Sequence, residues 1–243
     1  MLIVPMTLIW GWGQAEDLDL VEHIDAATRG YTNISRWEYF LTQIRAVVTY
    51  IRLIFLPINQ NIDYHYPISN SFFSPEVFMS FLFLLSVFAF AMYLLYRSDN
   101  REALSRLTAF GVLWFFIALA VESSLIPLPT LVNEYRLYLP STGVFLAVLS
   151  GTFIIFGKIK SRRLQAYLMS AITLVPVLLL LYATYERNHT FRSMASIWGD
   201  AVKKSPGNPR AHYNLGVAHQ SEGRYDDAIK HFYHSLRLDP NCE

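Results

Sequence analysis

Long apolar runs separated by short polar segments are the strongest pattern in the sequence. Four runs approach the roughly 20 residues that a helix needs to cross about 30 Å of bilayer hydrocarbon. They are residues 76–96, 107–127, 141–157 and 164–185. Buried helices of soluble proteins usually have shorter apolar runs, of about 10–14 residues. The four runs therefore predict four transmembrane helices within residues 76–185.

Basic residues are distributed unevenly between these runs. Loop 97–106 contains three arginines, and loop 158–163 contains four lysines and arginines with no acid. Loop 57–75 contains neither residue type, and loop 128–140 contains only Arg136. Because short loops rich in Lys and Arg stay in the cytoplasm, we predict that the second pair of loops and the whole C-terminal tail face away from it.

Segment 37–56 carries polar residues at alternating steps of four and three, which is typical of one face of a helix. The polar positions are Glu38, Thr42, Arg45, Thr49 and Arg52. Arginines that face lipid are costly. One interpretation is a helix that lies at the headgroup interface with both arginines in water. In a second, Arg45 and Arg52 lie near a lipid-linked phosphate, and a conventional span is the third.

The first 36 residues combine a short apolar run with an acidic stretch. Residues 1–12 have about half the length of a span. They also lack the basic start and the cleavage site of a signal peptide. We therefore expect a partial transmembrane helix at this end and interpret the chain as the C-terminal portion of a longer protein.

Composition and charge narrow the class of protein. Hydrophobic residues make up 53% of the chain and charged residues 16%, which excludes a disordered chain. The net charge of +1 gives no sign of nucleic-acid binding. Cys242 is the only cysteine, which excludes an intrachain disulfide and a cysteine-based zinc site.

The tail contains five histidines, and we weigh them as possible metal ligands. They are His189, His212, His219, His231 and His234. No carboxylate completes a set at the spacing of a metal site. We therefore expect these histidines to be surface or packing residues, and we expect neither a metal nor a cofactor.

Residues 209–242 resemble one tetratricopeptide repeat (TPR), a pair of antiparallel helices. The matching structural positions are Leu215, Gly216, Gly223, Tyr225, Ala228, Phe232 and Pro240. Small residues let the two helices approach closely, Gly223 permits the tight turn, and Pro240 ends the second helix. Segment 190–206 has the spacing of the second helix of a preceding repeat. The resemblance implies that the tail binds a partner protein.

A few ionisable residues lie where the predicted spans meet the outer side. Glu122 lies near the outer end of the second run, and Glu134 and Arg136 lie in loop 128–140. Charged groups at a membrane boundary are functional candidates. Alternatively, Glu134 and Arg136 form a surface ion pair worth about 0–1 kcal/mol. In loop 57–75, Asp63 and His65 form either an acid–base pair or an ordinary solvated loop.

The segments RLIFLP, NIDY, ESSLIP and NEYRLYLPS, followed by the repeat, resemble the TMTC-like (transmembrane and TPR) mannosyltransferases. The resemblance implies a GT-C glycosyltransferase that takes a sugar from a polyprenyl-phosphate carrier. It implies that Arg52, Arg136 and Arg45 neutralise the carrier phosphate. The catalytic acid of such enzymes lies upstream of this chain, so its catalytic residues stay unknown. Tyr135 departs from the histidine expected in the motif.

Together these patterns predict an all-α protein, a polytopic transmembrane helix bundle followed by a TPR module. The expected parts are residues 1–36, 37–75, 76–185 and 190–243. The first functional hypothesis is the C-terminal part of a membrane glycosyltransferase, not catalytic alone, whose partners are a polyprenyl-phosphate sugar and a protein acceptor. The alternative is a non-enzymatic membrane-anchored TPR scaffold for envelope protein assembly. We expect a bacterial inner membrane, with the tail on the periplasmic side.

Overall fold

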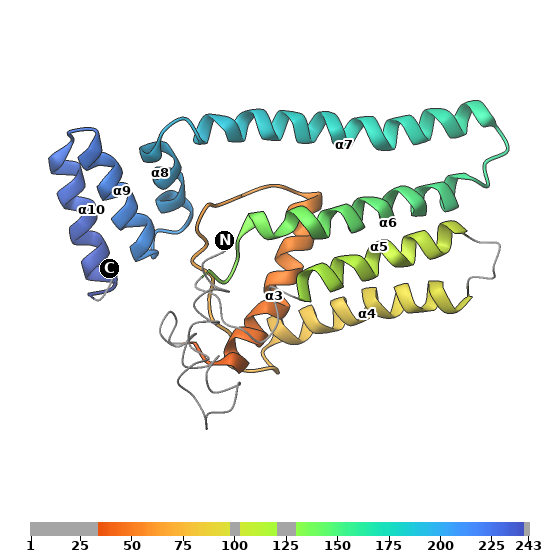
Figure 1. The fold of residues 1–243 in the computed structure, drawn as a ribbon, viewed down its shortest axis with the longest axis horizontal. Helices are drawn as coiled ribbons and strands as arrows, with labels where there is room; N and C mark the ends of the chain where they lie inside the picture. The colour runs from red at the N-terminus through yellow and green to blue at the C-terminus, as the bar shows by residue number, and fades with distance from the viewer. Residues whose placement is uncertain (1–33, 98–102, 121–129, 241–243) are drawn as a thin grey trace, which may run out of the picture.

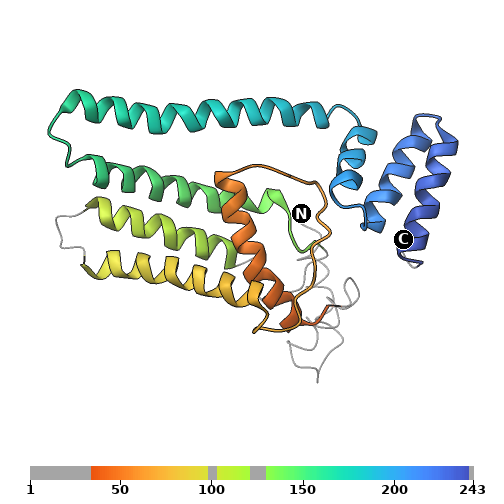
Figure 2. The same ribbon diagram turned by 180° about the vertical axis from the view of Figure 1, so that it is seen from behind.

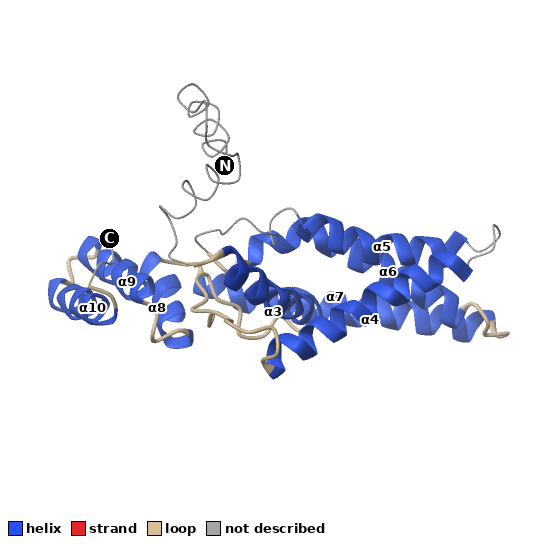
Figure 3. Cartoon of the chain, turned by 90° about the horizontal axis from the view of Figure 1, so that it is seen from below, coloured by secondary structure: helices blue, strands red, loops and turns tan. Residues whose placement is uncertain are grey.

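The computed structural model describes residues 34–97, 103–120 and 130–240, and every regular element in these ranges is helical (Figure 1). Figure 3 shows the same chain coloured by secondary structure. The elements are α3 (Arg36–Phe55), α4 (Pro75–Arg97), α5 (Ala103–Ala120), the 3-10 turn η2 (Glu134–Leu137), α6 (Tyr138–Phe156), α7 (Arg162–Thr190), α8 (Met194–Lys204), α9 (Pro209–Ser221) and α10 (Tyr225–Leu238). The prediction of an all-α protein is confirmed. The predicted partial helix in residues 1–12 lies outside the described ranges.

Four of the described helical segments are long and apolar enough to cross a membrane, which confirms the four predicted spans. They are α4, α5, the segment Glu134–Phe156 that joins η2 to α6, and α7. Their axes lie roughly side by side, and successive helices run in opposite directions (Figures 1 and 2). Many of their large apolar side chains are exposed, and α7 has no buried residue at all. Such surfaces suit a lipid environment, where apolar side chains need no protein cover.

Helices α5 and α6 are packed backbone to backbone. A Cβ atom added to Gly143 would lie 2.4 Å from the carbonyl oxygen of Gly111, and the reverse distance is the same. The hydroxyls of Thr108 and Ser150 lie 2.8 Å apart across the same interface. Small residues at a helix crossing allow this close approach in membranes. Glycine at both positions is therefore what sets the distance between α5 and α6.

Helix α3 begins with a capping box and then crosses the end of the bundle. The amide of Glu38 donates to the Ser35 hydroxyl, and the Glu38 carboxylate accepts the Ser35 amide at 3.0 Å. In Figures 1 and 2 the helix runs across the ends of α4, α5 and α6 rather than alongside them. Its buried face packs on Phe115 and Leu119 of α5 and on Val77 of α4.

The placement of α3 concerns the three interpretations of segment 37–56. Residues Val77 and Leu119 lie at the start of α4 and the end of α5, so α3 covers the end of the spans. Helix α3 is not among the described helices that are long and apolar enough to span a membrane. Helix α3 thus crosses the ends of the spans with an apolar face toward the bundle, and its position at the headgroup interface stays a prediction.

The tail forms a helical hairpin with the features expected of a tetratricopeptide repeat. Gly216 of α9 faces the ring of Phe232 on α10, where an added Cβ would lie only 2.7 Å from the ring. Leu215 and Ala228 are buried between the helices. Gly223 adopts a φ of 77° in the turn, a conformation that glycine accepts without strain. Helix α10 begins at Tyr225 and ends two residues before Pro240.

The extramembrane parts gather at one end of the bundle. Helix α4 begins there, α5 ends there, α6 begins there and α7 ends there, and α3 and the tail lie at the same end (Figures 1 and 2). We call residues 57–67, which run from the end of α3 toward α4, the strap. The strap passes between α3 and the tail and contacts both the start of η2 and helices α8 and α9.

Candidate functional site

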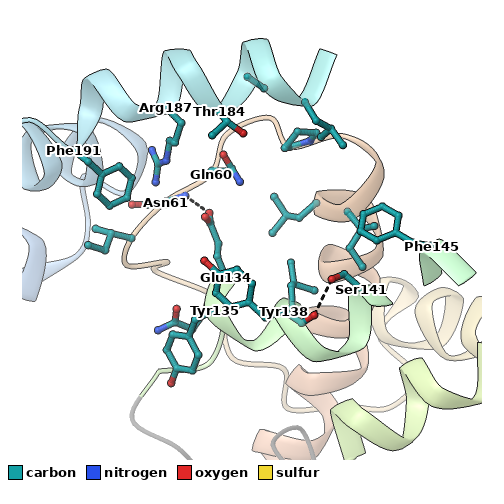
Figure 4. A pocket seen from close by; sticks show the side chains of 18 residues that line it. Gln60, Asn61, Glu134, Tyr135, Tyr138, Ser141, Phe145, Thr184, Arg187 and Phe191 are labelled. Atoms are coloured by element: carbon teal, nitrogen blue, oxygen red, sulfur yellow. Dashed lines mark hydrogen bonds between the residues drawn. The ribbon is translucent and has the colours of Figure 1, made fainter. Parts of the chain in front are cut away.

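A cleft of about 610 Å³ opens between the strap, the start of α6 and the last turns of α7 (Figure 4). Both polar and apolar residues line it. The polar lining includes Gln60, Asn61, Glu134, Thr184 and Arg187. The apolar lining includes Leu53, Ile54, Phe145, Leu180 and Phe191. Because the cleft lies at the end of the spans, it can accept a molecule with a polar head and an apolar chain.

Glu134 is the acidic residue of this cleft, and the strap holds it in place. Its carboxylate oxygen Oε1 accepts the Asn61 amide and the Tyr64 hydroxyl, each at 2.8 Å. Burial raises the pKa of the Tyr64 hydroxyl, and the hydrogen bond to Glu134 raises it further. Tyr64 therefore remains protonated and donates to Glu134.

Arg187, in the last turns of α7, is the basic residue of the cleft lining. Its Nη1 atom lies 2.8 Å from Oδ2 of Asp200, which also binds Nζ of Lys204 at 2.7 Å. The guanidinium also lies 5.1 Å from the ring centroid of Phe191. The sequence analysis missed Arg187, although its position as the first basic residue after the fourth apolar run was a usable signal.

Arg52 lies in the last turn of α3 with an exposed side chain. In the described part of the chain its guanidinium makes no hydrogen bond or ion pair. Its charge lies near enough to Tyr64 to lower the pKa of that hydroxyl slightly against the larger effect of burial. Its neighbours Leu53 and Ile54 line the cleft. Arg52 is therefore a cation that is available to an anionic ligand.

The other two predicted arginines hold loops in place. Arg45 donates to the Ser69 hydroxyl at 2.9 Å and forms an ion pair of 2.6 Å with Glu76 at the start of α4. Arg136 is only 4% exposed, and it donates to the carbonyl of Thr130 at 2.9 Å. Both guanidinium groups are thus engaged by the chain itself, whereas that of Arg52 points to solvent.

The structure separates Asp63 from His65. Asp63 is 5% exposed, and its carboxylate binds Nε of Arg210, in the first turn of α9, at 2.7 Å. The ring of His65 is exposed, while its amide donates to the Ser205 hydroxyl. Asp63 therefore pairs with the tail rather than with its neighbour in the sequence. The remaining candidate, Glu122, lies outside the described residues.

Four of the tail histidines meet between α9 and α10. The Nδ1 atoms of His212 and His231 lie 3.2 Å apart, and the ring centroids of His212 and His234 are separated by 4.4 Å. The ring of His219 is tilted by 41° against that of His231, with the centroids 5.4 Å apart. Burial lowers the pKa of His212 and of His231. Within residues 34–97, 103–120 and 130–240, no group of three or more metal-ligating side chains is placed to hold a metal.

Comparison with known proteins identifies the relatives of this chain. The tetratricopeptide-repeat family matches residues 209–242. Protein O-mannosyl-transferase F38B6.6 of Caenorhabditis elegans is 35% identical over 46% of this chain and 15% of its own length. Tmtc3 of Drosophila melanogaster is 28% identical over 56% of this chain, and human TMTC3 is 26% identical over 68%. The alignments cover 15% and 17% of those two proteins. No solved structure matches the chain.

The chain thus spans less than a fifth of the length of these curated relatives. The similarity extends beyond the repeat, since the alignment with human TMTC3 covers 164 residues whereas the repeat covers only residues 209–242. It therefore includes membrane helices. The chain is a membrane tetratricopeptide-repeat protein whose relatives are TMTC-type protein O-mannosyltransferases.

Proposed function

We propose that this chain is part of a membrane glycosyltransferase of the GT-C kind, and that its cleft binds the phosphate end of a polyprenyl-phosphate sugar. The amphipathic cleft at the end of the spans carries this proposal, because it places a cation and polar groups beside an apolar channel wall. The similarity to protein O-mannosyltransferases supports it. In this proposal the tail holds the acceptor or another partner protein.

The division of the cleft lining suits such a carrier. The prenyl chain would lie against Phe145 and Leu180, on the apolar side of the cleft, and the phosphate would lie toward Arg187. Arg52, next in the sequence to the lining residues Leu53 and Ile54, would supply a second cation. Guanidinium groups match phosphate oxygens in geometry and stay charged at all physiological pH values. The two donors that occupy Glu134 reduce its repulsion of the phosphate.

The chain would bind the carrier without transferring the sugar alone. Transfer to a hydroxyl needs a carboxylate that accepts the hydroxyl proton. One carboxylate oxygen of Glu134 already accepts two hydrogen bonds from the strap, so it is occupied and less available to accept a hydroxyl proton. A catalytic acid upstream of this chain, as the family resemblance implies, would complete the site.

Binding of a polyprenyl monophosphate to the chain in lipid nanodiscs tests this proposal. We expect Arg187→Gln and Arg52→Ala each to weaken the affinity about tenfold, since each removes one charge-assisted contact. The matched control is Arg162→Gln at the opposite end of α7, which should bind as the wild type does. Unchanged affinity in both test variants would show that the phosphate does not bind at this end of the cleft. Failure of the wild type to bind would favour the scaffold alternative.

We also propose that the strap, the cleft and the tail face away from the cytoplasm, which in a bacterial inner membrane is the periplasmic side. The basic loop 158–163 at the other end of the spans supports this orientation. In a Cys242→Ser background, an impermeant maleimide applied to intact cells should label Ser71→Cys. It should spare Ser161→Cys. The opposite labelling pattern would reverse the orientation.

A further inference from the structure

The strap makes most of its polar contacts with one corner of the tail, where α8 meets α9. Arg210 binds the carboxylate of Asp63 with both Nε and Nη2, the first at 2.7 Å. Nζ of Lys204 donates to the Gln60 carbonyl at 2.7 Å, and Asn208 donates to the Asp63 carbonyl. The strap residues involved have no helix or strand structure of their own.

Most of the hydrogen-bond donors in this contact belong to the tail, and most of the acceptors belong to the strap. The tail contributes a guanidinium, an ammonium and a side-chain amide, all as donors. The strap contributes one carboxylate and two backbone carbonyls as acceptors. In the opposite direction, the Ser205 hydroxyl accepts the side-chain amide of Asn61 at 2.9 Å and the backbone amide of His65 at 3.4 Å. A surface can bind an extended acidic peptide when its donors bind one carboxylate and the backbone carbonyls on either side of it.

We propose that the α8–α9 corner is a binding surface for an extended acidic segment of a partner protein, and that the strap occupies it as an internal ligand. The surface consists of Lys204, Ser205, Asn208 and Arg210. In the structure described here Asp63 supplies the carboxylate. A partner segment displaces the strap by supplying a carboxylate to Arg210 and carbonyls to Lys204 and Asn208.

Two properties make an exchange of ligands reasonable. The Arg210 side chain is 45% exposed, so a partner can reach it before the strap leaves. A buried carboxylate and a guanidinium are costly to leave unpaired, so the corner favours one acidic ligand or another over an empty state. The strap is fixed at both ends by α3 and α4, which gives it a high effective concentration. A partner therefore competes against the strap and not against water.

The strap also links this surface to the cleft. The backbone amide of Asn61 donates to Glu134, and the side-chain amide of the same residue donates to Ser205. Asn61 is 2% exposed. Displacement of the strap from the tail therefore loosens a donor that holds Glu134. Binding of an acidic segment does not itself require that the cleft binds a lipid phosphate, so the two proposals stand or fall separately.

A fluorescent peptide that copies residues 59–66, Asn-Gln-Asn-Ile-Asp-Tyr-His-Tyr, tests the proposal on the full chain in phosphatidylcholine nanodiscs. Asp63→Asn in the protein weakens the internal ligand, so we expect this variant to bind the peptide at least about tenfold more tightly than the wild type. Arg210→Ala removes the surface itself and should abolish binding. Opposite effects from the two halves of one ion pair are not expected of a merely structural contact.

Three controls accompany this experiment. A peptide with Asn in place of its Asp should bind neither protein. Arg237→Ala, an exposed arginine at the end of α10, should bind the peptide as the wild type does. Arg210→Lys keeps the charge without the two-pronged geometry and should fall between the wild type and Arg210→Ala. Circular dichroism establishes that each variant retains its helices.

Hydrogen exchange in the wild type gives a second result that needs no variant. A large excess of the unlabelled peptide should speed exchange of the Asn61 amide, because the strap leaves the tail and loosens its bond to Glu134. The proposal is overturned when Asp63→Asn gains no affinity over the wild type, when Arg210→Ala still binds, or when saturating peptide leaves the strap amides unchanged.

Discussion

Helix α6 has two very different faces. Toward α5 it packs so closely that Gly143 and Gly111 leave no room for a single methyl group. Toward α7 it borders the cleft, which is lined by Tyr138, Ser141 and Phe145 on the α6 side. Both neighbours of α6 are apolar helices of spanning length. Length and hydropathy alone therefore place a helix in the membrane without saying which helices touch.

The difference follows from where small residues lie. On α6, Gly143, Ala147 and Gly151 recur at steps of four, and the first two contact Gly111 of α5. Lipid chains are as apolar as leucine, so burial of apolar side chains does not drive helices together in a bilayer. Close backbone packing does so instead. A large ligand fits where that packing is absent, which is why the cleft lies on the α7 side.

Disrupting the face of α6 that packs on α5 should have the largest effect on stability. In Gly143→Leu the new side chain meets the backbone of Gly111, which cannot move aside as a flexible side chain would. We expect a loss of about 3 kcal/mol of stability, at the upper end of the range for overpacked sites. Thermal unfolding in detergent measures it. In the matched control Gly151→Ala, the nearest atom lies 3.9 Å away, so full stability is expected.

Filling the cleft between α6 and α7 should leave the stability of the protein intact and weaken binding of the polyprenyl phosphate. Ala183 of α7 lines the cleft, and Ala183→Phe adds a ring to space that no side chain occupies. We expect the stability to change by no more than about 0.5 kcal/mol. The affinity for a polyprenyl monophosphate should fall about tenfold, because the ring takes the place of the first prenyl units. A large loss of stability would mean that α6 and α7 are packed as tightly as α5 and α6.

Removing one polar contact from the close face should have a smaller effect. Thr108→Val deletes the hydroxyl that meets Ser150 across the interface. Hydrogen bonds between membrane helices contribute about 0.6 kcal/mol on average, and we expect a loss of that size. Thr173→Val on α7 is the matched control, since that hydroxyl bonds only to the Met169 carbonyl of its own helix. Equal losses in both variants would show that the interhelical bond contributes nothing.

The tail should respond to pH while the α5–α6 pair does not. Burial lowers the pKa of His212 and His231 below the ordinary value of 6.5, so the unfolded tail binds protons more readily than the folded tail. The stability of the hairpin is therefore complete above about pH 6.5 and falls as the pH drops below it. Thermal unfolding followed between pH 7.5 and 5.5 measures this effect. In His212→Phe, the decline should become shallower.

Local patterns predicted most of the fold because they arise from neighbours in the sequence. Hydropathy located the four spans, and the polar stripe of 37–56 predicted a helix with an apolar face. The repeat positions predicted the hairpin of α9 and α10. The spacing of Gly143, Ala147 and Gly151 is a further signal in the sequence, since small residues at steps of four favour a close helix contact that hydropathy does not reveal.

The candidate site was less predictable because its contacts join distant segments. Asp63 and Arg210 are 147 residues apart in the sequence, and Asn61 and Glu134 are 73 apart. No periodicity connects such residues. Arg45 and Arg136 share with Arg52 the position at a membrane boundary, and only the folded structure distinguishes the arginines that hold loops from the one that faces solvent. The three arginines could therefore be named as candidates from their positions in the sequence, whereas their different roles depend on tertiary contacts.

The most direct test of this account is photo-crosslinking with a polyprenyl monophosphate that carries a diazirine in its first prenyl unit. The chain is crosslinked in nanodiscs and digested, and mass spectrometry locates the modified peptides. We expect modification of the start of α6, around Tyr138 to Phe145, and of the end of α7, around Leu180 to Arg187. Modification concentrated around 158–163, at the opposite end of the same two helices, would contradict the proposed carrier site.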